Sequence, residues 1–365
     1  MSSNQGVLDA SLEQALTFRW DDLPALSADL SGTAGRIRYE PEDFVVEELP
    51  AYLPEGRGSH TYVRVEKVGR TTRDLVALLA SAGVPDRSIG VAGLKDKLAR
   101  TQQWLSLPNA HAAALSALEG AEGVRVLEVS RHRNKLGIGH LRGNRFTIRV
   151  RDVEPGAAAR ARAVLASLRE RGVPNYVGPQ RFGRFGRNAV DGYLELRGHV
   201  QPGGPRLRRF FVAALQSQLF NLLLAERIRD GTFASVVAGD WARKHDTGGT
   251  FEVLDVAAEA PRAQALAISA TLPLYGSKVR VSGANAGERE LALLERLGLR
   301  WQDFRARRGD RRITRLAGLD ASVEDEGDAL TLRFTLQKGS YATTLLREIM
   351  KVPVDAPTEE PGEDA

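Results

Sequence analysis

A glycine- and proline-rich segment at residues 172–192 divides this sequence into two parts of different character. Before it, short apolar runs that alternate with polar residues predict mostly strands; the clearest is at 144–150. After it, a long amphipathic run at 210–229 predicts a helix, and a strand and a helix close the chain at 329–337 and 341–351. The strands and helices do not alternate regularly, so the sequence predicts an α+β fold and not a doubly wound parallel sheet.

Local signals place the other elements. Thr71 to Asp74 has the spacing of a capping box and predicts a helix that ends at Gly83. The first thirty-odd residues, 1–32, are expected to be a loosely ordered lead-in, and the acidic tail at 355–365 is expected to be disordered. The remaining predicted strands cover 37–48 (interrupted by Pro41), 60–68, 88–92, 103–107 and 124–130, and the remaining predicted helices cover 157–171 and 288–297.

The composition excludes several kinds of chemistry. The sequence has no cysteine, which removes disulfides, thiolate nucleophiles and cysteine-ligated metals. Its six histidines lack metal-ligand spacing, and neither a phosphate-binding Gly-x-x-x-x-Gly-Lys-Ser/Thr loop nor a Gly-x-Ser-x-Gly motif occurs. We therefore expect no metal site, and nucleotide hydrolysis and α/β-hydrolase chemistry lose support. The sequence shows neither an apolar stretch of about 20 residues nor a signal-peptide pattern, so a soluble cytoplasmic protein is expected.

The charge balance favours a polyanionic partner. Lys and Arg total 51 against 46 Asp and Glu, a net charge of +5. The tail holds acids and no base, so the net charge of the rest of the chain is more positive than +5. Most of these bases are arginine, whose planar guanidinium suits phosphates and nucleobases. A biased genome composition is the competing explanation for the excess of arginine.

Asp96 is the most informative single residue. It lies between Lys95 and Lys97, in a loop that joins two short apolar runs within residues 89–107. Neighbouring cations favour the ionised carboxylate, and an ionised carboxylate at the edge of a strand can act as a nucleophile. Taken alone, an Asp-Lys pair of this kind is more often an ordinary surface turn.

Five segments together resemble the TruD family of tRNA pseudouridine synthases. They occur in the family's order and at compatible spacings, from about residue 33 to 351. They read Pro-Glu-Asp-Phe-Val-Val-Glu-Glu at 41–48, Ala-Gly-Leu-Lys-Asp-Lys at 92–97 with Gln-Trp at 103–104, Arg-Gly-Asn-Arg-Phe-Thr at 142–147, Gly-Val-Pro-Asn-Tyr-Val-Gly-Pro-Gln-Arg-Phe-Gly at 172–183, and Lys-Gly-Ser-Tyr-Ala-Thr-Thr at 338–344 with Leu-Arg-Glu at 346–348.

The resemblance implies a pseudouridine-synthase catalytic domain, with a mixed sheet and a central cleft, interrupted by a family-specific α/β insertion domain. The catalytic domain would comprise residues 1–171 and 316–354, and the insertion would run from 172 to 315. The implied reaction is the isomerisation of uridine 13 of tRNA to pseudouridine, a step of tRNA processing that needs no cofactor. The N1–C1′ bond breaks, the uracil turns, and C5 bonds to C1′.

The same resemblance assigns the site. Asp96 matches the catalytic aspartate, which would attack either C1′ or C6 of the nucleoside. Arg347 is the favoured partner for its carboxylate, with Lys95 and Lys97 as other candidates. The substrate-binding positions are Phe44, Asn144, Phe146 and Tyr341, the last often Phe in the family. Alternate positions on one strand put Asn144 and Phe146 on one face, suited to an extruded base, although Phe146 and Phe44 could equally be core residues.

Basic residues elsewhere are candidates for contacts with the tRNA backbone, and such contacts would make affinity fall steeply with salt. These candidates are Lys95, Lys97, Lys135, Arg142, Arg145, Arg308, Arg311 and Arg312.

Three other functions stay open at this point. One is an RNA-binding or RNA-folding protein without catalysis, and another is a pseudouridine synthase that acts mainly on another RNA. A carbohydrate-acting enzyme fits the basic charge poorly. The sequence leaves the oligomeric state open, with a monomer plausible.

Overall fold

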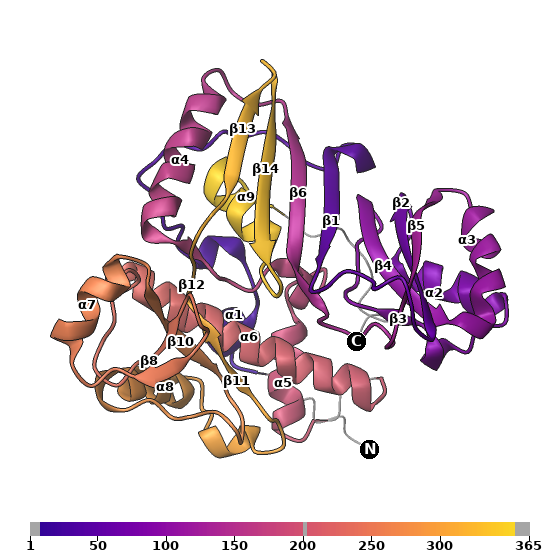
Figure 1. Cartoon of the computed structure of the whole chain (residues 1–365). Helices are drawn as coiled ribbons and strands as arrows, with labels where there is room; N and C mark the ends of the chain where they lie inside the picture. The colour runs from indigo at the N-terminus through magenta and orange to yellow at the C-terminus, as the bar shows by residue number, and fades with distance from the viewer. Residues whose placement is uncertain (1–7, 200–202, 355–365) are drawn as a thin grey trace. The chain divides into compact units, whose positions relative to one another are not determined.

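The computed structural model describes residues 8–199 and 203–354, and its contacts divide the chain into two compact units, each discontinuous in sequence (Figure 1). Unit 1 comprises residues 1–31, 163–319 and 343–365, and unit 2 comprises residues 32–162 and 320–342. The helix α4 (Ala157–Arg171) crosses the boundary between them.

Unit 2 is built on an 8-stranded mixed sheet (Figure 1). Its strands run in the order β13-β14-β6-β1-β4-β2-β5, with β3 also pairing with β4; β1 and β4 are parallel, and the other neighbours are antiparallel. This mixed α+β architecture confirms the predicted fold class. The strands are β1 (Phe44–Pro50), β2 (His60–Lys67), β3 (Gly90–Val91), β4 (Arg100–Pro108), β5 (Val124–His132), β6 (Leu141–Arg151), β13 (Ala321–Asp325) and β14 (Ala329–Gln337).

The short helices of unit 2 follow from local capping. In α2 (Thr72–Ser81), the Thr71 hydroxyl accepts from the Asp74 amide while the Asp74 carboxylate accepts from the Thr71 amide, which confirms the predicted capping box. The other short helical elements are η2 (Pro41–Asp43), η3 (Asp86–Ser88), η4 (Asn109–Leu115) and α3 (Ser116–Glu119).

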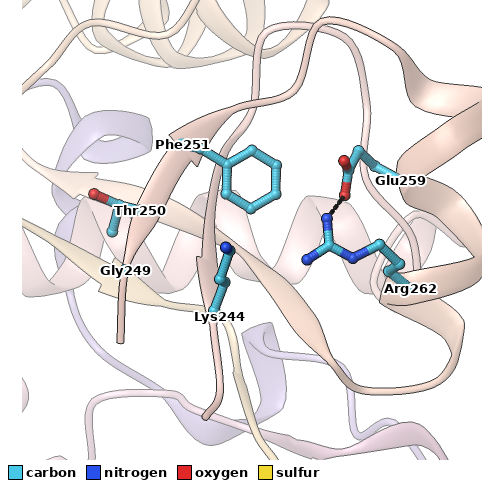
Figure 2. A pocket seen from close by; sticks show the side chains of 6 residues that line it. All are labelled: Lys244, Gly249, Thr250, Phe251, Glu259 and Arg262. Atoms are coloured by element: carbon cyan, nitrogen blue, oxygen red, sulfur yellow. Dashed lines mark hydrogen bonds and ion pairs between the residues drawn. The ribbon is translucent and has the colours of Figure 1, made fainter. Parts of the chain in front are cut away.

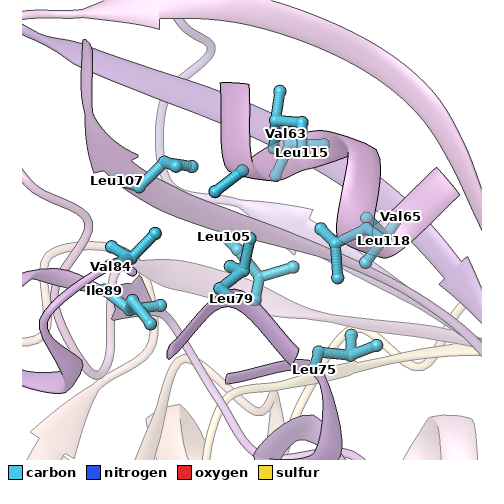
Figure 3. Packing of buried hydrophobic residues seen from close by; sticks show 11 residues of the cluster. Val63, Val65, Leu75, Leu79, Val84, Ile89, Leu105, Leu107, Leu115 and Leu118 are labelled. Carbon is cyan, nitrogen blue, oxygen red and sulfur yellow. The ribbon is translucent and has the colours of Figure 1, made fainter. Parts of the chain in front are cut away.

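An apolar cluster joins α2 to the sheet (Figure 3). Leu75 and Leu79 of α2 are fully buried against apolar side chains of β2 and β4, and residues of η4 and α3 complete the cluster. Each fully buried leucine contributes about 1.5–3 kcal/mol, so this cluster fixes the helix whose first turn lies beside the Asp96 loop. The sheet members are Val63, Val65, Leu105 and Leu107.

Unit 1 contains a 4-stranded antiparallel sheet in the order β11-β10-β8-β9 and the longest helix, α6 (Pro205–Arg229), which contacts β10. Its strands are β8 (Trp241–Lys244), β9 (Thr250–Glu252), β10 (Ile268–Leu274) and β11 (Asp310–Ile313). Its other helical elements are α1 (Ala10–Leu16), η1 (Trp20–Asp22), η5 (Pro179–Arg181), α5 (Asn188–Leu196), α7 (Val256–Gln264), α8 (Ala284–Arg296), η6 (Trp301–Phe304) and α9 (Ala342–Met350).

The two ends of the predicted insertion meet in a small antiparallel sheet. Strand β7 (Val173–Pro174) pairs with β12 (Arg315–Leu316), so the end of the predicted insertion lies beside its start. The units nevertheless differ from the predicted domains, because residues 10–31 and 343–354 group with the middle of the chain and not with the large sheet.

Side-chain hydrogen bonds explain that grouping and correct the predicted loose lead-in. The Glu348 carboxylate of α9 accepts from the Leu26 amide at 2.7 Å and from the Ser27 hydroxyl at 2.6 Å, and the Trp20 indole donates to the Val354 carbonyl. Leu16, Trp20 and several neighbours are buried. The lead-in is therefore an ordered part of unit 1 from residue 8 onward.

The strand predicted at 37–48 is shorter in the structure. It begins only at Phe44, because Pro41 starts the 3-10 turn η2 instead. The tail at 355–365, predicted to be disordered, lies outside the described residues. Within the described ranges, no helix is long and apolar enough to cross a membrane, and no cluster of three or more His, Asp or Glu side chains could hold a metal ion.

Candidate active site

One face of the large sheet in unit 2 carries three of the predicted site residues, Phe44, Asn144 and Phe146. In an antiparallel pair, directly opposed residues project from the same face. The register of β1 and β6 opposes Glu48 to Asn144 and Val46 to Phe146. Phe44, two residues before Val46, lies on that face as well. The predicted common face of Asn144 and Phe146 thus exists, because β6 continues through both.

Asp96 lies in the loop 92–99 that joins β3 to β4, and three polar contacts hold this loop. The Lys67 ammonium donates to the Asp96 carbonyl at 2.7 Å, the Lys95 amide donates to the Thr72 hydroxyl at 2.8 Å, and the Gly139 amide donates to the Ala92 carbonyl at 2.8 Å. The Asp96 side chain keeps 37% of its surface exposed. The backbone is therefore fixed while the carboxylate stays accessible.

The cation beside Asp96 is Arg38, which the sequence alone did not single out. Arg38 Nη2 lies 3.6 Å from Asp96 Oδ2, and its guanidinium lies 4.1 Å from the centroid of the Phe44 ring. Burial lowers the pKa of Arg38, and the Asp96 carboxylate opposes that shift by favouring the charged form. The buried Arg38 guanidinium thus lies between the Asp96 carboxylate and the Phe44 ring of β1.

The backbone of Arg38 is unusual as well. Its φ is 60°, in the left-handed region that a residue with a side chain adopts only at some cost. Such strain persists only where the surroundings enforce it, and it is common at functional sites. In the sequence, the one signal that could have pointed to Arg38 as a site residue was its position just ahead of the Pro41 to Glu48 motif.

Lys95, predicted to contact the tRNA backbone or to pair with Asp96, pairs with Glu48 in this structure. Its ammonium lies 2.7 Å from Glu48 Oε2 with both side chains almost fully buried, and Glu48 Oε1 accepts from the Trp104 amide. A buried carboxylate needs such partners, and the Lys95 ammonium serves as one of them for Glu48. This pair ties the Asp96 loop to the β1 position opposite Asn144.

The two phenylalanines of the site are core residues in this structure. Phe44 and Phe146 are 3% and 7% exposed, and Phe146 stacks on Phe334 of β14 with ring centroids 5.1 Å apart. Phe44 contacts Phe146 edge to face. The Phe44 ring contacts the Arg38 guanidinium, and the Phe146 ring packs against Phe44.

Asn144 offers an unsatisfied polar atom on the same face. Its Oδ1 is buried and accepts no hydrogen bond from the residues that the structure describes. A buried acceptor without a partner is costly, so its retention points to a ligand that donates. Tyr341, the other predicted substrate contact, is half-buried on the segment that follows β14, after the turn in which the Ser340 amide donates to the Gln337 carbonyl.

Arg347, predicted to hold the Asp96 carboxylate, has other partners within unit 1. Its Nη2 donates to the carbonyls of Trp20 (2.7 Å) and Leu23, and its guanidinium lies 4.9 Å from a ring centroid of Trp20. It closes the N-terminal segment onto α9. Within unit 2, the guanidinium that lies beside the Asp96 carboxylate is that of Arg38.

The predicted RNA contacts at Arg311 and Arg312 are also corrected. Arg311 forms an ion pair with Glu290 at 2.6 Å, with the side chains 9% and 2% exposed, and donates to the Thr271 carbonyl. Arg312 donates to the carbonyl and side chain of Asn175. These arginines join elements within unit 1, whereas Arg308 is exposed.

We expect Arg311→Met to destabilise the protein by about 3–5 kcal/mol, because it leaves the Glu290 carboxylate buried beside a neutral side chain. Arg308→Ala, on the exposed side of the same segment, should change stability by no more than about 0.5 kcal/mol. Urea denaturation of both variants measures the difference. Equal stability of the two would contradict the structural role of Arg311.

Four exposed cations of unit 2 remain from the predicted RNA-contacting set. Arg145 makes a loose pair with Glu47 at 3.5 Å, Arg142 donates to the Pro50 carbonyl, and Lys135 donates to the Arg87 carbonyl. Lys97, next to Asp96, is exposed as well.

A separate cavity of about 240 Å³ lies in unit 1 between β8, β9 and α7 (Figure 2). The Phe251 ring borders it, flanked by the ammonium of Lys244 and by the guanidinium of Arg262, which pairs with Glu259 at 2.6 Å. None of the predicted site residues lines this cavity.

Comparison with known proteins shows which family the chain belongs to. The family model described as tRNA pseudouridine synthase D (TruD) matches residues 22–190 and 198–349. A tRNA pseudouridine synthase D of Thermus thermophilus is 52% identical over 338 residues, which cover 92% of this chain and 94% of that protein. The enzyme of the same name from Anaeromyxobacter dehalogenans strain 2CP-C is 48% identical over 349 residues, covering 93% and 99%.

The fold has a counterpart among solved structures. The putative tRNA pseudouridine synthase D from Methanosarcina mazei superposes with a TM-score of 0.72 over 95% of this chain and 99% of that one, at 24% identity. The family match defines a class of RNA-modifying isomerase. The chain belongs to the TruD family of tRNA pseudouridine synthases, which isomerise uridine to pseudouridine in tRNA.

Proposed function

We propose that this enzyme converts uridine 13 of tRNA to pseudouridine and that Asp96 is the nucleophile. The observation that carries the proposal is the Asp96 carboxylate, paired with Arg38 at 3.6 Å yet exposed over 37% of its side chain. Glu48, the other carboxylate on this face, has both oxygens occupied and is buried, so it cannot attack a nucleoside. The choice of position 13 rests on the family resemblance.

The reaction begins with a uridine extruded from the RNA stack, because its ring atoms are out of reach inside a helix. Asp96 attacks the nucleoside and forms a covalent bond to it, the N1–C1′ bond breaks, the uracil turns and C5 bonds to C1′. The bond to Asp96 then breaks and restores the free carboxylate. The proton on C5 is lost and N1 gains one, so atoms balance without a co-reactant. Arg38, 3.6 Å from the carboxylate, holds it in position for the attack.

Asn144 selects the base in this scheme. Uracil carries a hydrogen on N3, whereas the N3 of cytosine is an acceptor, so the Oδ1 of Asn144 favours uracil where it faces N3 of the base. A site built to bond such a group discriminates strongly, because the wrong base leaves its buried acceptor unpaired. Tyr341 offers a ring and a hydroxyl to the same nucleoside, while Phe44 and Phe146 support the site from below.

The exposed cations Lys97, Lys135, Arg142, Arg145 and Arg308 contact the tRNA backbone in this proposal. Each neutralised phosphate adds about 0.7–0.9 to the slope of the logarithm of the binding constant against the logarithm of salt concentration. A slope near zero would remove the electrostatic part of the proposal.

The function is tested by mapping pseudouridine at single-nucleotide resolution in tRNA incubated with the purified protein. We expect modification at position 13, and none in a matched transcript that carries cytidine there. Modification of other uridines alone would reject position 13 but keep the synthase. A protein that binds tRNA without modifying any uridine would be an RNA-binding protein instead.

A further inference from the structure

A four-residue turn in unit 1, Gly183-Arg184-Phe185-Gly186, presents an aromatic ring to solvent. Phe185 is 73% exposed, whereas Phe182, three residues earlier, is fully buried and stacks on Phe18 with ring centroids 4.4 Å apart. One phenylalanine anchors the segment, and the other points outward. Exposing so large a ring brings no packing benefit to the folded chain.

The turn is held rigidly. The Gly186 amide donates to the Gly183 carbonyl at 3.1 Å, and the Phe18 amide donates to the Gly186 carbonyl at 2.9 Å. Gly186 has a φ of 71°, and a Cβ there would lie 2.4 Å from the Phe18 carbonyl oxygen. The position of Phe185 is therefore fixed before any partner arrives, which lowers the entropy lost on binding.

The surroundings of the ring are basic. The Arg184 guanidinium lies 5.3 Å from the Phe185 ring centroid, and Arg181 lies 5.1 Å from the ring of Phe210 at the start of α6. The first turn of α6 holds no acidic residue. Its first turns carry Arg206, Arg208 and Arg209.

We propose that Phe185 is a stacking platform for an unpaired base of tRNA and that Arg184 contacts the adjoining phosphate. A flat ring beside guanidinium groups suits a nucleotide, which presents a π-face and an anion together. A protein partner would instead call for a continuous apolar patch, and the side chain shown against the Phe185 ring is the Arg184 guanidinium. The inference rests on the proposed function, which supplies tRNA as the ligand.

The test compares equilibrium dissociation constants for tRNA of wild type, Phe185→Ala and Phe185→Trp. Loss of one stacked base raises the dissociation constant about tenfold, so we expect Phe185→Ala to bind tRNA about tenfold more weakly than wild type. Phe185→Trp should bind with wild-type affinity or better. Leu254→Ala is the matched control, because Leu254 is an 84% exposed apolar residue of the same unit. It should bind like wild type.

Arg184→Ala should weaken binding and lower the salt slope by about 1, whereas Phe185→Ala should leave the slope unchanged. Unchanged affinity of Phe185→Ala for tRNA would overturn the proposal, and so would a loss that follows only from a change in oligomeric state. These outcomes are separate from the proposed function. If wild type forms pseudouridine and Phe185→Ala binds normally, only the stacking platform is rejected.

Discussion

Asp96→Asn is expected to lower kcat for pseudouridine formation by at least about 1000-fold while changing tRNA affinity less than twofold. Asparagine has nearly the shape of aspartate but cannot serve as an anionic nucleophile, so the barrier rises by about 4 kcal/mol or more. Binding should survive, because the contacts that hold the loop at Lys67, Thr72 and Gly139 involve backbone atoms of the loop or other side chains.

Nucleoside analysis by mass spectrometry measures the pseudouridine formed, and filter binding measures the affinity. Glu48→Gln is an instructive comparison, because it alters the other carboxylate of the same face. It removes the charge that Lys95 pairs with and should lower stability, yet the variant molecules that remain folded should turn over. Turnover by Asp96→Asn within tenfold of wild type would reject the nucleophile.

Arg38→Gln is expected to lower kcat by about 100-fold, the second-largest effect on activity. Removal of one preorganised charged or donor group from a partly buried site costs a factor of this size. Arg38 also shapes the site, because its guanidinium covers Phe44 at 4.1 Å. The loss should appear in kcat with little change in KM, since Arg38 faces the carboxylate and not the RNA backbone.

Arg38→Lys separates charge from shape. Lysine keeps the cation but loses the flat group that lies on Phe44, so about a tenfold loss is expected, intermediate between wild type and the glutamine variant. Thermal melting of all three proteins controls for folding. Equal activity of Arg38→Gln and wild type would show that the ion pair is incidental, and equal loss in both variants would assign Arg38 a purely structural role.

The sequence predicted those parts of the site that depend on short-range patterns. The alternation along β6 put Asn144 and Phe146 on one face, and the capping box at Thr71 marked the start of α2. Periodicity and capping act within a few residues, so they are visible in a single sequence.

Partners from distant elements were not predictable in the same way. The arginine run at 305–315 resembles an RNA-binding segment, yet Arg311 is neutralised by Glu290 from α8, and Arg312 bonds to Asn175, 137 residues away. Arg38 was overlooked for a similar reason. It is one of many arginines, and only the fold brings it to Asp96.

The N-terminal segment illustrates the same limit at the scale of the fold. Residues 8–31 show no strong periodicity, so they read as a loose lead-in. Their order depends on α9, more than 300 residues later, where Glu348 and Arg347 bind the segment's backbone. A terminus that is tied down by the opposite end of the chain cannot be recognised from local composition.

The most direct test of the role of Asp96 is tritium release from tRNA labelled at C5 of uridine, in single turnover with saturating wild type or Asp96→Asn. The C5 hydrogen leaves only when C5 bonds to C1′, and saturation removes differences in affinity. We expect one equivalent of tritium released per modified uridine by wild type and none above background by Asp96→Asn. Release at a comparable rate by both proteins would contradict the central role of Asp96.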